Sequence, residues 1–294
     1  MPELPEVETV RRGLEPVLVG NAFVRVEQRR GDLRFPLPKH FRARLEGQTV
    51  EALDRRAKYL LARLDDGEVL VMHLGMTGSF SIDVANGAAS VSGRFAHPQP
   101  DIPKHEHIVF HLGDGTAIRY SDARRFGLMD LIRADTLESH GLFKGLGVEP
   151  LSPAFTPAWL ASKLKGKATS IKAALVDQRL IAGLGNIYAS EALYRAHISP
   201  LKLAGTLATK SGKPTPKTEA LVAAVKAVLE DAIKAGGSSL RNYRRADGSL
   251  GDFQHRFKVY GREGKPCSRK GCGGTVRRIV QGGRSTFYCP TCQR

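Results

Sequence analysis

The first eight residues of the chain, MPELPEVE, combine residue types that could do chemistry. If Met1 is removed, Pro2 becomes a terminal secondary amine and Glu3 supplies a carboxylate directly beside it. Such a pair could act as a nucleophile and a proton donor. The same stretch also suits a plain helix start, because Pro5 fits a first turn and Glu6 complements the helix dipole there. The N-terminus alone leaves both interpretations open.

The four cysteines near the C-terminus form the clearest chemical pattern. They follow the spacing C-x4-C-x16-C-x2-C and are all the cysteines of the chain. Two short-spaced pairs on turns supply the four thiolates that tetrahedral zinc prefers. Between the pairs, TVRRIV and RSTFYC around Gln281–Gly282–Gly283 predict a β-hairpin. We therefore expect one structural Zn²⁺ in a closed site made by Cys267, Cys272, Cys289 and Cys292.

Glycines precede a predicted helix in GLGNIYASE, Gly183 to Glu191. Backbone N–H groups at such a helix start can bind an anion, and Asn186 is suited to be the N-cap. No Gly-Lys-Ser/Thr follows, and the glycine spacing does not match a dinucleotide fingerprint, so neither nucleotide-binding motif applies. The remaining interpretation is a helix–turn–helix, from SIKAALVDQ to NIYASEALY, that grips a phosphate backbone.

Two other turns, HLGMTGS and SDARRFG, each carry an apolar residue, Met76 or Phe126. Beside arginines such a residue could insert into a base stack, although ordinary packing is the simpler explanation from the residues alone. The histidines of HEHIVFH, which are His105, His107 and His111, have even spacing and are expected on one strand face. A metal site there lacks carboxylate partners, so contact with solvent or phosphate is favoured.

The charge of the chain favours a polyanionic partner. The formal net charge is +16 and the pI is about 9.9. From Arg241 to Arg294 there are 13 Lys or Arg against 3 Asp or Glu. Such an excess favours nucleic acid. A membrane surface is the weakest alternative, because no basic amphipathic helix with an aromatic face stands out.

The remaining patterns indicate an α+β protein. Short alternating segments and polar turns over 22–133 predict an antiparallel sandwich or barrel, and 134–155 is loose enough to be a linker. Helical periodicity follows in 156–240, with the cysteine-rich region in 241–294. An apolar content of 41% excludes a disordered chain. Neither a signal peptide nor a membrane span is evident, so we expect a cytosolic protein.

Taken together, MPELPEVETV, RRAKYLL, HLGMTGS, DARRFG, GLGNIYASE and the terminal RSTFYC-x-x-C resemble the formamidopyrimidine-DNA glycosylase family of base-excision repair. The motifs run in the family's order from Met1 to the last cysteine pair. The resemblance implies an N-terminal β-sandwich with an N-terminal helix, a helix–two-turn–helix region and a zinc finger, with DNA in the cleft between. It also implies a monomer associated with the nucleoid in the bacterial cytosol.

The resemblance further implies a bifunctional glycosylase and abasic-site lyase. Its substrates would be oxidised purines, namely 8-oxoguanine and formamidopyrimidines. Pro2 would attack C1′ of the damaged nucleotide and form an imine, and Glu3 would be the proton donor. Lys58 would assist β-elimination and Arg284 δ-elimination, which leaves a one-nucleotide gap with phosphates at both ends.

DNA contacts are implied as well. They are His105, Arg124, Lys167, Lys172, Asn186, Met76 and Phe126. Of these, Met76, Arg124 and Phe126 would fill the gap left by a flipped-out base. The segment 238–253, with Arg244, Arg245 and Gly248, resembles a mobile loop over that base. The stretches 83–104 and 205–217 are expected to be loops that are longer than usual for the family.

Two rival functions remain at this stage. An endonuclease VIII-like glycosylase acts on oxidised pyrimidines and shares Pro2, Glu3 and the zinc finger. Leu4 and the RRF segment favour the purine branch, since the sister group typically carries glycine after Pro-Glu. A zinc-finger protein that binds DNA without catalysis is the other rival. Such a binder has no need of Pro2, Glu3 and Lys58 together.

Overall fold

A computed structural model describes residues 1–84, 103–238 and 253–294 of the protein. The chain divides into two compact units, Met1–Lys144 with Ala235–Asp252, and Gly145–Lys234 with Phe253–Arg294. The first division falls within the stretch 134–155 that the sequence suggests as a linker. The functional domain boundaries stay a prediction.

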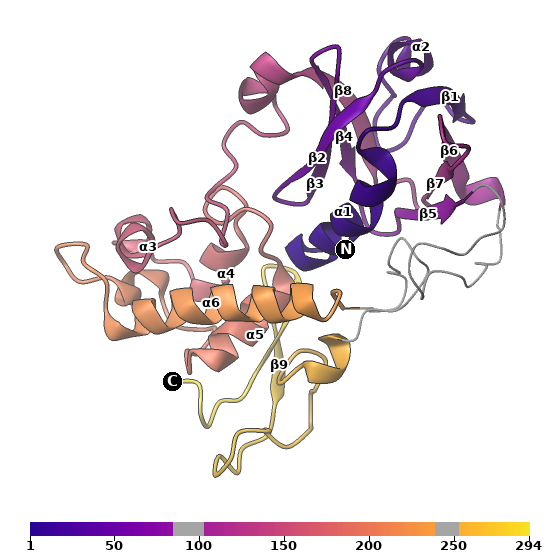
Figure 1. The fold of residues 1–294 in the computed structure, drawn as a ribbon. Coiled ribbons are helices and arrows are strands. Elements are labelled where there is room, and N and C mark those ends of the chain that lie inside the picture. Colours follow the sequence, from indigo (N-terminus) through magenta and orange to yellow (C-terminus); the bar gives the residue numbers. More distant parts are fainter. Residues whose placement is uncertain (85–102, 239–252) are drawn as a thin grey trace. The chain divides into compact units, whose positions relative to one another are not determined.

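The first unit is built on two antiparallel sheets of four strands (Figure 1). One sheet has the order β1-β6-β7-β5 and the other the order β2-β3-β4-β8. Their bounds are β1 Phe23–Gln28, β2 Val50–Arg56, β3 Tyr59–Leu64, β4 Glu68–His73, β5 Ser79–Asp83, β6 Glu106–Leu112, β7 Ala117–Ser121 and β8 Leu128–Arg133. Side chains from both sheets, such as Phe110 and Leu60, belong to one buried apolar core. The predicted sandwich is thereby confirmed.

Helix α1, Leu4–Leu18, lies against β2 and β3 of the second sheet (Figure 1). Its apolar stripe is buried as the sequence predicts, with Val7, Val10 and Leu14 in the core. A second, five-residue helix, α2 (Phe41–Leu45), has too short a pattern to be predicted from periodicity. It begins after Pro38 and covers β1 with Phe41 and Leu45.

The histidine-rich strand differs from its prediction. His105 precedes β6 in a short 3-10 helix, η1 (Pro103–His105), and the register with β7 shifts between Glu106 and Ile108. This irregularity breaks the alternation on which the prediction of a shared face depended. His107 is buried and contacts the backbone of Asp122, whereas the His111 ring pairs with Glu27. A common face for the three histidines is therefore wrong.

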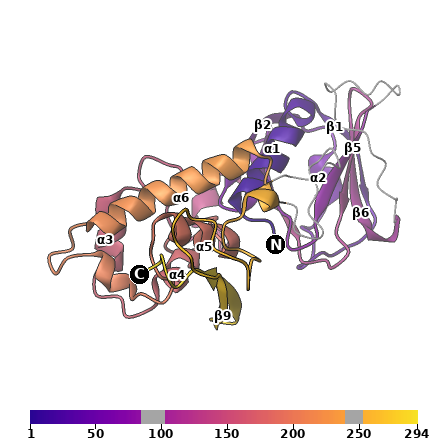
Figure 2. The ribbon, with the colours of Figure 1, turned by 90° about the horizontal axis from the view of Figure 1, so that it is seen from below.

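The second unit contains a group of helices: α3 (Pro157–Leu164), α4 (Ile171–Val176), α5 (Asn186–Arg195) and α6 (Pro216–Lys234). Helix α6 packs along α5 (Figure 2) and buries the predicted stripe that includes Leu221, Val225 and Val228. Serine 170 caps α4 by accepting the Ala173 N–H. Asn186 is the first residue of α5 and not its N-cap, because the extended residue before the helix is Gly185.

The C-terminal part of this unit is the predicted hairpin of β9 (Arg277–Gln281) and β10 (Arg284–Tyr288). Both turn residues, Gly282 and Gly283, have positive φ, as a two-residue hairpin turn requires. Strand β10 contacts α5. The buried carboxylate of Glu191 accepts the backbone N–H groups of residues 258–260, which fixes the approach to the finger.

The structure describes only some of the predicted loops. Most of 83–104 lies outside the described residues, as does most of the segment 238–253, including Arg244, Arg245 and Gly248. The stretch 205–217 contains part of a 3-10 helix, η3 (Ala204–Leu207), and a bridge between Ala208 and Pro214. Further short 3-10 helices are η2 (Ala134–Ser139) and η4 (Phe253–Arg256). None of the described helices has both the length and the apolar character of a membrane-spanning segment.

Candidate functional site

The N-terminal residues are held in place by the start of α1. Glu3 is the N-cap, and it forms a capping box in which its side chain and that of Glu6 each bind the other's backbone N–H. Both carboxylates are buried, as is the ring of Pro2. Glu6 also accepts the backbone N–H and the hydroxyl of Ser238. The helix-start interpretation of MPELPEVE is confirmed, and the same helix start fixes Glu3 beside Pro2, whose catalytic roles stay a prediction.

The terminal amine lies in an unusual electrostatic environment. Burial lowers the pKa of the Met1 amine below its ordinary value, while the carboxylates of Glu3 and Glu6 raise it. The charges of Lys58 and Arg124 lower that pKa further. Groups from residues 3, 58 and 124 therefore act on the same amine. An amine in such surroundings has a larger neutral, nucleophilic fraction than an exposed one.

Lys58 reaches this environment because of the turn between β2 and β3. Ala57 has a φ of 53°, and Arg55 donates to the Ala57 carbonyl at 2.9 Å. Arg55 in turn pairs with Glu8 of α1. Lys58 is 6% exposed. The turn thus holds the Lys58 side chain buried, where its charge acts on the terminal amine.

His73, at the end of β4, belongs to the same environment, although sequence reasoning assigned it no role. Its Nδ1 accepts the Gly75 N–H at 3.0 Å, and its ring packs on Tyr59. Burial lowers the pKa of His73 to about 4, with the charges of Lys58 and Arg34 acting in the same direction. The imidazole is therefore neutral at physiological pH with its proton on Nε2. The sequence signal was a polar residue two positions before Gly75.

Asp122 organises the two turns that carry Met76 and Phe126. Its side chain is completely buried and accepts the Gly127 N–H at 2.8 Å and the Thr77 hydroxyl. It also accepts the Arg124 N–H at 3.3 Å. One carboxylate therefore fixes both turns, and sequence reasoning missed this residue because SDARRFG does not reveal burial.

The two turns approach each other so closely that only glycine fits at the contact. A Cβ on Gly75 would lie 2.3 Å from the Phe126 carbonyl carbon. Met76 and Phe126 nevertheless remain exposed at 41% and 43%, and the Arg124 guanidinium lies 4.6 Å from the Phe126 ring centre. Exposed apolar side chains on a rigid support suit insertion into a base stack and not core packing.

Gly127→Ala is expected to force the two turns apart. The new Cβ would lie 1.9 Å from the Tyr120 hydroxyl and 2.8 Å from the His73 carbonyl oxygen. We expect a loss of about 1–3 kcal/mol in the free energy of unfolding, as for other overpacked sites. Chemical denaturation measures it. Gly113→Ala is the matched control, because its Cβ would meet its nearest atom at 3.8 Å. Equal stability of the two variants would contradict the close packing of the turns.

His105 lies next to this arrangement. Its carbonyl oxygen accepts the backbone N–H of Asp122 at 2.9 Å, and its side chain is partly exposed. In the first unit, the charges of Glu3, Lys58 and Arg124 thus act on the terminal amine next to Pro2. Backbone and side-chain bonds of Asp122 connect the segments that carry Met76, His105, Arg124 and Phe126.

In the second unit, Lys172 and Asn186 form one cluster with the hairpin. The Lys172 ammonium donates to the Asn186 side-chain oxygen and, at 2.6 Å, to the Thr286 hydroxyl. The Asn186 amide donates to the Ser285 carbonyl oxygen at 2.8 Å. Lys172 is only 2% exposed. Its side chain thus connects the start of α5 to β10. Because Lys172 is buried, it would influence DNA binding by positioning Asn186 and the hairpin, and not by touching DNA itself.

The other two basic candidates lie elsewhere in this unit. Arg284 is exposed at the start of β10, two residues before Thr286. Lys167 is exposed on the turn after α3, and its carbonyl oxygen accepts the Gly205 N–H. The cluster of Lys172 therefore includes the strand of Arg284.

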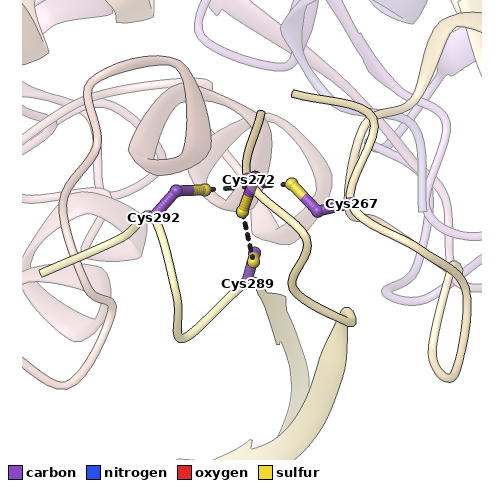
Figure 3. Close-up of side chains that lie close together, drawn as sticks. All are labelled: Cys267, Cys272, Cys289 and Cys292. Atoms are coloured by element: carbon purple, nitrogen blue, oxygen red, sulfur yellow. Dashed lines mark hydrogen bonds between the residues drawn. The ribbon is translucent and has the colours of Figure 1, made fainter. Parts of the chain in front are cut away.

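The four cysteines converge as the spacing predicts (Figure 3). Their sulfur atoms lie within 4.8 Å of one another, with 3.6 Å between Cys272 and Cys289 and 3.8 Å between Cys267 and Cys292. Tetrahedral zinc with Zn–S bonds of about 2.3 Å requires sulfur separations of about 3.8 Å. The residues present therefore fit one structural zinc, and four protein ligands leave no open position for catalysis.

Family models match most of the chain. The formamidopyrimidine-DNA glycosylase N-terminal domain matches residues 1–129 and the H2TH domain of the same enzyme matches 146–244. The zinc finger found in FPG and IleRS matches 264–294. The chain belongs to the formamidopyrimidine-DNA glycosylase family. The helix–two-turn–helix region and the zinc finger expected from the sequence are confirmed by these matches.

Relatives of this family resemble the chain over its full length. A formamidopyrimidine-DNA glycosylase of Beijerinckia indica is 60% identical over 294 residues, which is all of both chains. A mutant Lactococcus lactis FPG, solved with Fapy-dG containing DNA, is 36% identical with a TM-score of 0.82 over both whole chains. The wild-type L. lactis Fpg, solved with an oxidized pyrimidine containing DNA, has a TM-score of 0.81 and 36% identity, again over both whole chains.

Proposed function

We propose that the chain is a bifunctional DNA glycosylase that removes oxidised purines and then nicks the abasic strand. A glycosylase of base-excision repair is the activity of the family to which it belongs. The observation that supports the assignment of residues is the burial of Pro2, Glu3 and Lys58, with the charges of Glu3 and Lys58 acting on the Met1 amine next to Pro2. Its substrate would be chromosomal DNA, so we place the enzyme at the nucleoid.

The chemistry begins once Met1 is removed. The neutral Pro2 amine attacks C1′ of the damaged nucleotide and loses its proton, while the C1′–N9 bond breaks and the purine leaves with a proton. Proton transfer to O4′ then breaks the C1′–O4′ bond and opens the sugar ring, and the nitrogen lone pair forms an iminium at C1′ that withdraws electrons and acidifies the C2′ hydrogen. Glu3, buried beside the amine, is the proposed proton donor. Lys58, in its neutral amine form, is the proposed base that takes the C2′ hydrogen as a proton, and the C2′ electron pair expels the 3′ phosphate by β-elimination.

The DNA contacts follow from exposure and hydrogen bonding. In the first unit, Met76, Arg124 and Phe126 fill the space of the extruded nucleotide, with His105 close by. The neutral His73 offers its Nε2–H to a phosphate. In the second unit, Asn186, Arg284 and Lys167 contact the backbone, and Lys172 positions Asn186. The zinc stabilises the hairpin that carries Arg284. A monomer suffices for these roles and stays a prediction.

Arg284→Ala is expected to stop the reaction after β-elimination. Without this guanidinium the second phosphate is not expelled, so strands ending in an unsaturated aldehyde accumulate. Denaturing gels of end-labelled duplex separate this product from the phosphate-ended one. Arg277→Ala, an exposed arginine on the facing strand, is the matched control. An unchanged product ratio in the Arg284 variant would remove this residue from the mechanism.

The substrate class is tested with two duplexes that differ only in the lesion. We expect faster single-turnover excision from a duplex with 8-oxoguanine than from one with an oxidised pyrimidine. The second class remains a candidate because a similar L. lactis Fpg binds DNA with an oxidised pyrimidine. Faster excision of the pyrimidine would assign the chain to that activity. Binding of both duplexes without excision would indicate a DNA-binding protein.

A further inference from the structure

Two exposed phenylalanines stand out in the first unit. Among the phenylalanines, tyrosines and tryptophans that the structure describes, only Phe35 and Phe126 are exposed. Their exposed fractions are 55% and 43%. Each has an arginine over its ring, Arg34 at 5.6 Å and Arg124 at 4.6 Å from the ring centre. Arg124 and Phe126 already have a proposed role in base extrusion. No role has been proposed for Arg34 and Phe35.

The loop that carries Arg34 and Phe35 is held firmly. The Leu33 N–H donates to the Phe35 carbonyl oxygen at 3.0 Å, and the Leu37 N–H donates to the Gly31 carbonyl oxygen at 2.9 Å. Leu33 and Leu37 are both buried in the main core. The ring of Phe35 is therefore presented outward by a closed, anchored loop, so its exposure is not a consequence of a loose chain.

This loop is attached directly to the turn that carries Phe126. The Arg34 N–H donates to the Gly127 carbonyl oxygen at 2.9 Å, and Arg125 lies 3.7 Å from the Asp32 carboxylate. The pKa of His73, lowered first by burial, is lowered further by the Arg34 charge. The Arg34 guanidinium is therefore close to the end of β4, where the candidate catalytic groups gather.

The ion pairs of the loop leave Arg34 available to bind a phosphate. Arg29 pairs with Glu106 and Arg30 with Asp32. Within residues 1–84, 103–238 and 253–294, no carboxylate forms an ion pair with Arg34 or Arg124. An exposed arginine beside an exposed ring matches the two parts of a nucleotide backbone, its anionic phosphate and its less polar sugar.

We propose that Arg34 and Phe35 form a second DNA contact beside the extrusion turn. Arg34 binds one backbone phosphate and Phe35 packs on the adjoining deoxyribose, on the flank of the gap that Met76 and Phe126 fill. The proposal rests on the proposed function, because it requires that these turns meet DNA. It adds one specific contact to the DNA backbone. This contact holds the duplex in place while one nucleotide is extruded.

Salt dependence of binding tests this contact. Arg34→Ala and Phe35→Ala are titrated onto a duplex with a tetrahydrofuran abasic analogue, by fluorescence anisotropy, between about 50 and 200 mM salt. Losing one phosphate contact should reduce the slope of log K against log salt by about 0.9. Phe35→Ala should weaken binding about fivefold with little change in the slope. A fivefold loss lies at the lower end of what one aromatic side chain contributes to nucleic-acid binding.

Matched variants separate the contact from general effects. Arg42→Ala removes the same charge from α2, where the arginine pairs with Glu46, and should leave the slope unchanged. Arg34→Lys keeps the charge and should retain the slope of the native protein. A slope for Arg34→Ala equal to that of Arg42→Ala would overturn the proposal, as would Arg34→Lys behaving like Arg34→Ala. Borohydride adduct formation at saturating protein reports the proposed function separately, since these variants should retain it.

Discussion

Pro2→Gly is expected to lower the single-turnover rate of base excision by roughly two orders of magnitude or more, the scale on which positioned catalytic groups act. The pyrrolidine amine is replaced by a flexible primary amine that is less well placed in the buried start of α1. Binding to an abasic-analogue duplex should change little, because the proposed DNA contacts lie on other turns. Excision is measured by release of 8-oxoguanine, and binding by anisotropy.

The matched control for this change is Pro5→Gly. Pro5 lies in the first turn of α1, so its loss loosens the helix start without touching the amine. We expect a modest effect on excision for Pro5→Gly and a large one for Pro2→Gly. If the two variants lost excision and binding equally, the N-terminus would be structural and the assignment of Pro2 as nucleophile would be wrong.

Cys289→Ser is expected to unfold the zinc finger. Cys289 is the buried member of the four, and it packs with Tyr194, Val259 and Val276 in a small apolar cluster. Structural zinc contributes roughly 10 kcal/mol or more of binding free energy to folding, and three remaining ligands hold the metal much less well. Zinc content, thermal unfolding by circular dichroism and DNA affinity should therefore all fall together.

Removal of the metal from the native protein provides the comparison. A chelator should lower the melting temperature and DNA affinity of the native protein, and added zinc should restore both. The same treatment should hardly change Cys289→Ser, because the site is already lost. A variant that keeps one bound zinc per chain and its melting temperature would contradict the structural role of the finger.

What could be predicted from the sequence is what local spacing determines. The cysteine spacing led directly to the finger, and the stripe of Val7, Val10 and Leu14 led to α1, because both patterns act over a few residues. The burial of Lys172 could not be predicted. A lysine after Ser170 looks like a surface cation, and only the packing of α4 against α5 and β10 turns it inward.

The same reason explains the other differences. Asp122 and His73 acquire their roles from turns that are brought together across two sheets, so no short motif reveals their partners. The even spacing of the histidines failed because one register shift in β6 changes which face a side chain occupies. Residue types in the motifs therefore indicated the chemistry, whereas burial and hydrogen bonding decided which residues act directly.

The proposed mechanism depends on an imine between the Pro2 amine and the damaged nucleotide. Borohydride trapping on a duplex with one 8-oxoguanine opposite cytosine tests it most directly, with peptide mapping of the adduct. We expect a covalent protein–DNA adduct on residue 2 of a chain that has lost Met1, and no adduct with an undamaged duplex. An adduct on a lysine, or none while the duplex is bound and Met1 is absent, would contradict it.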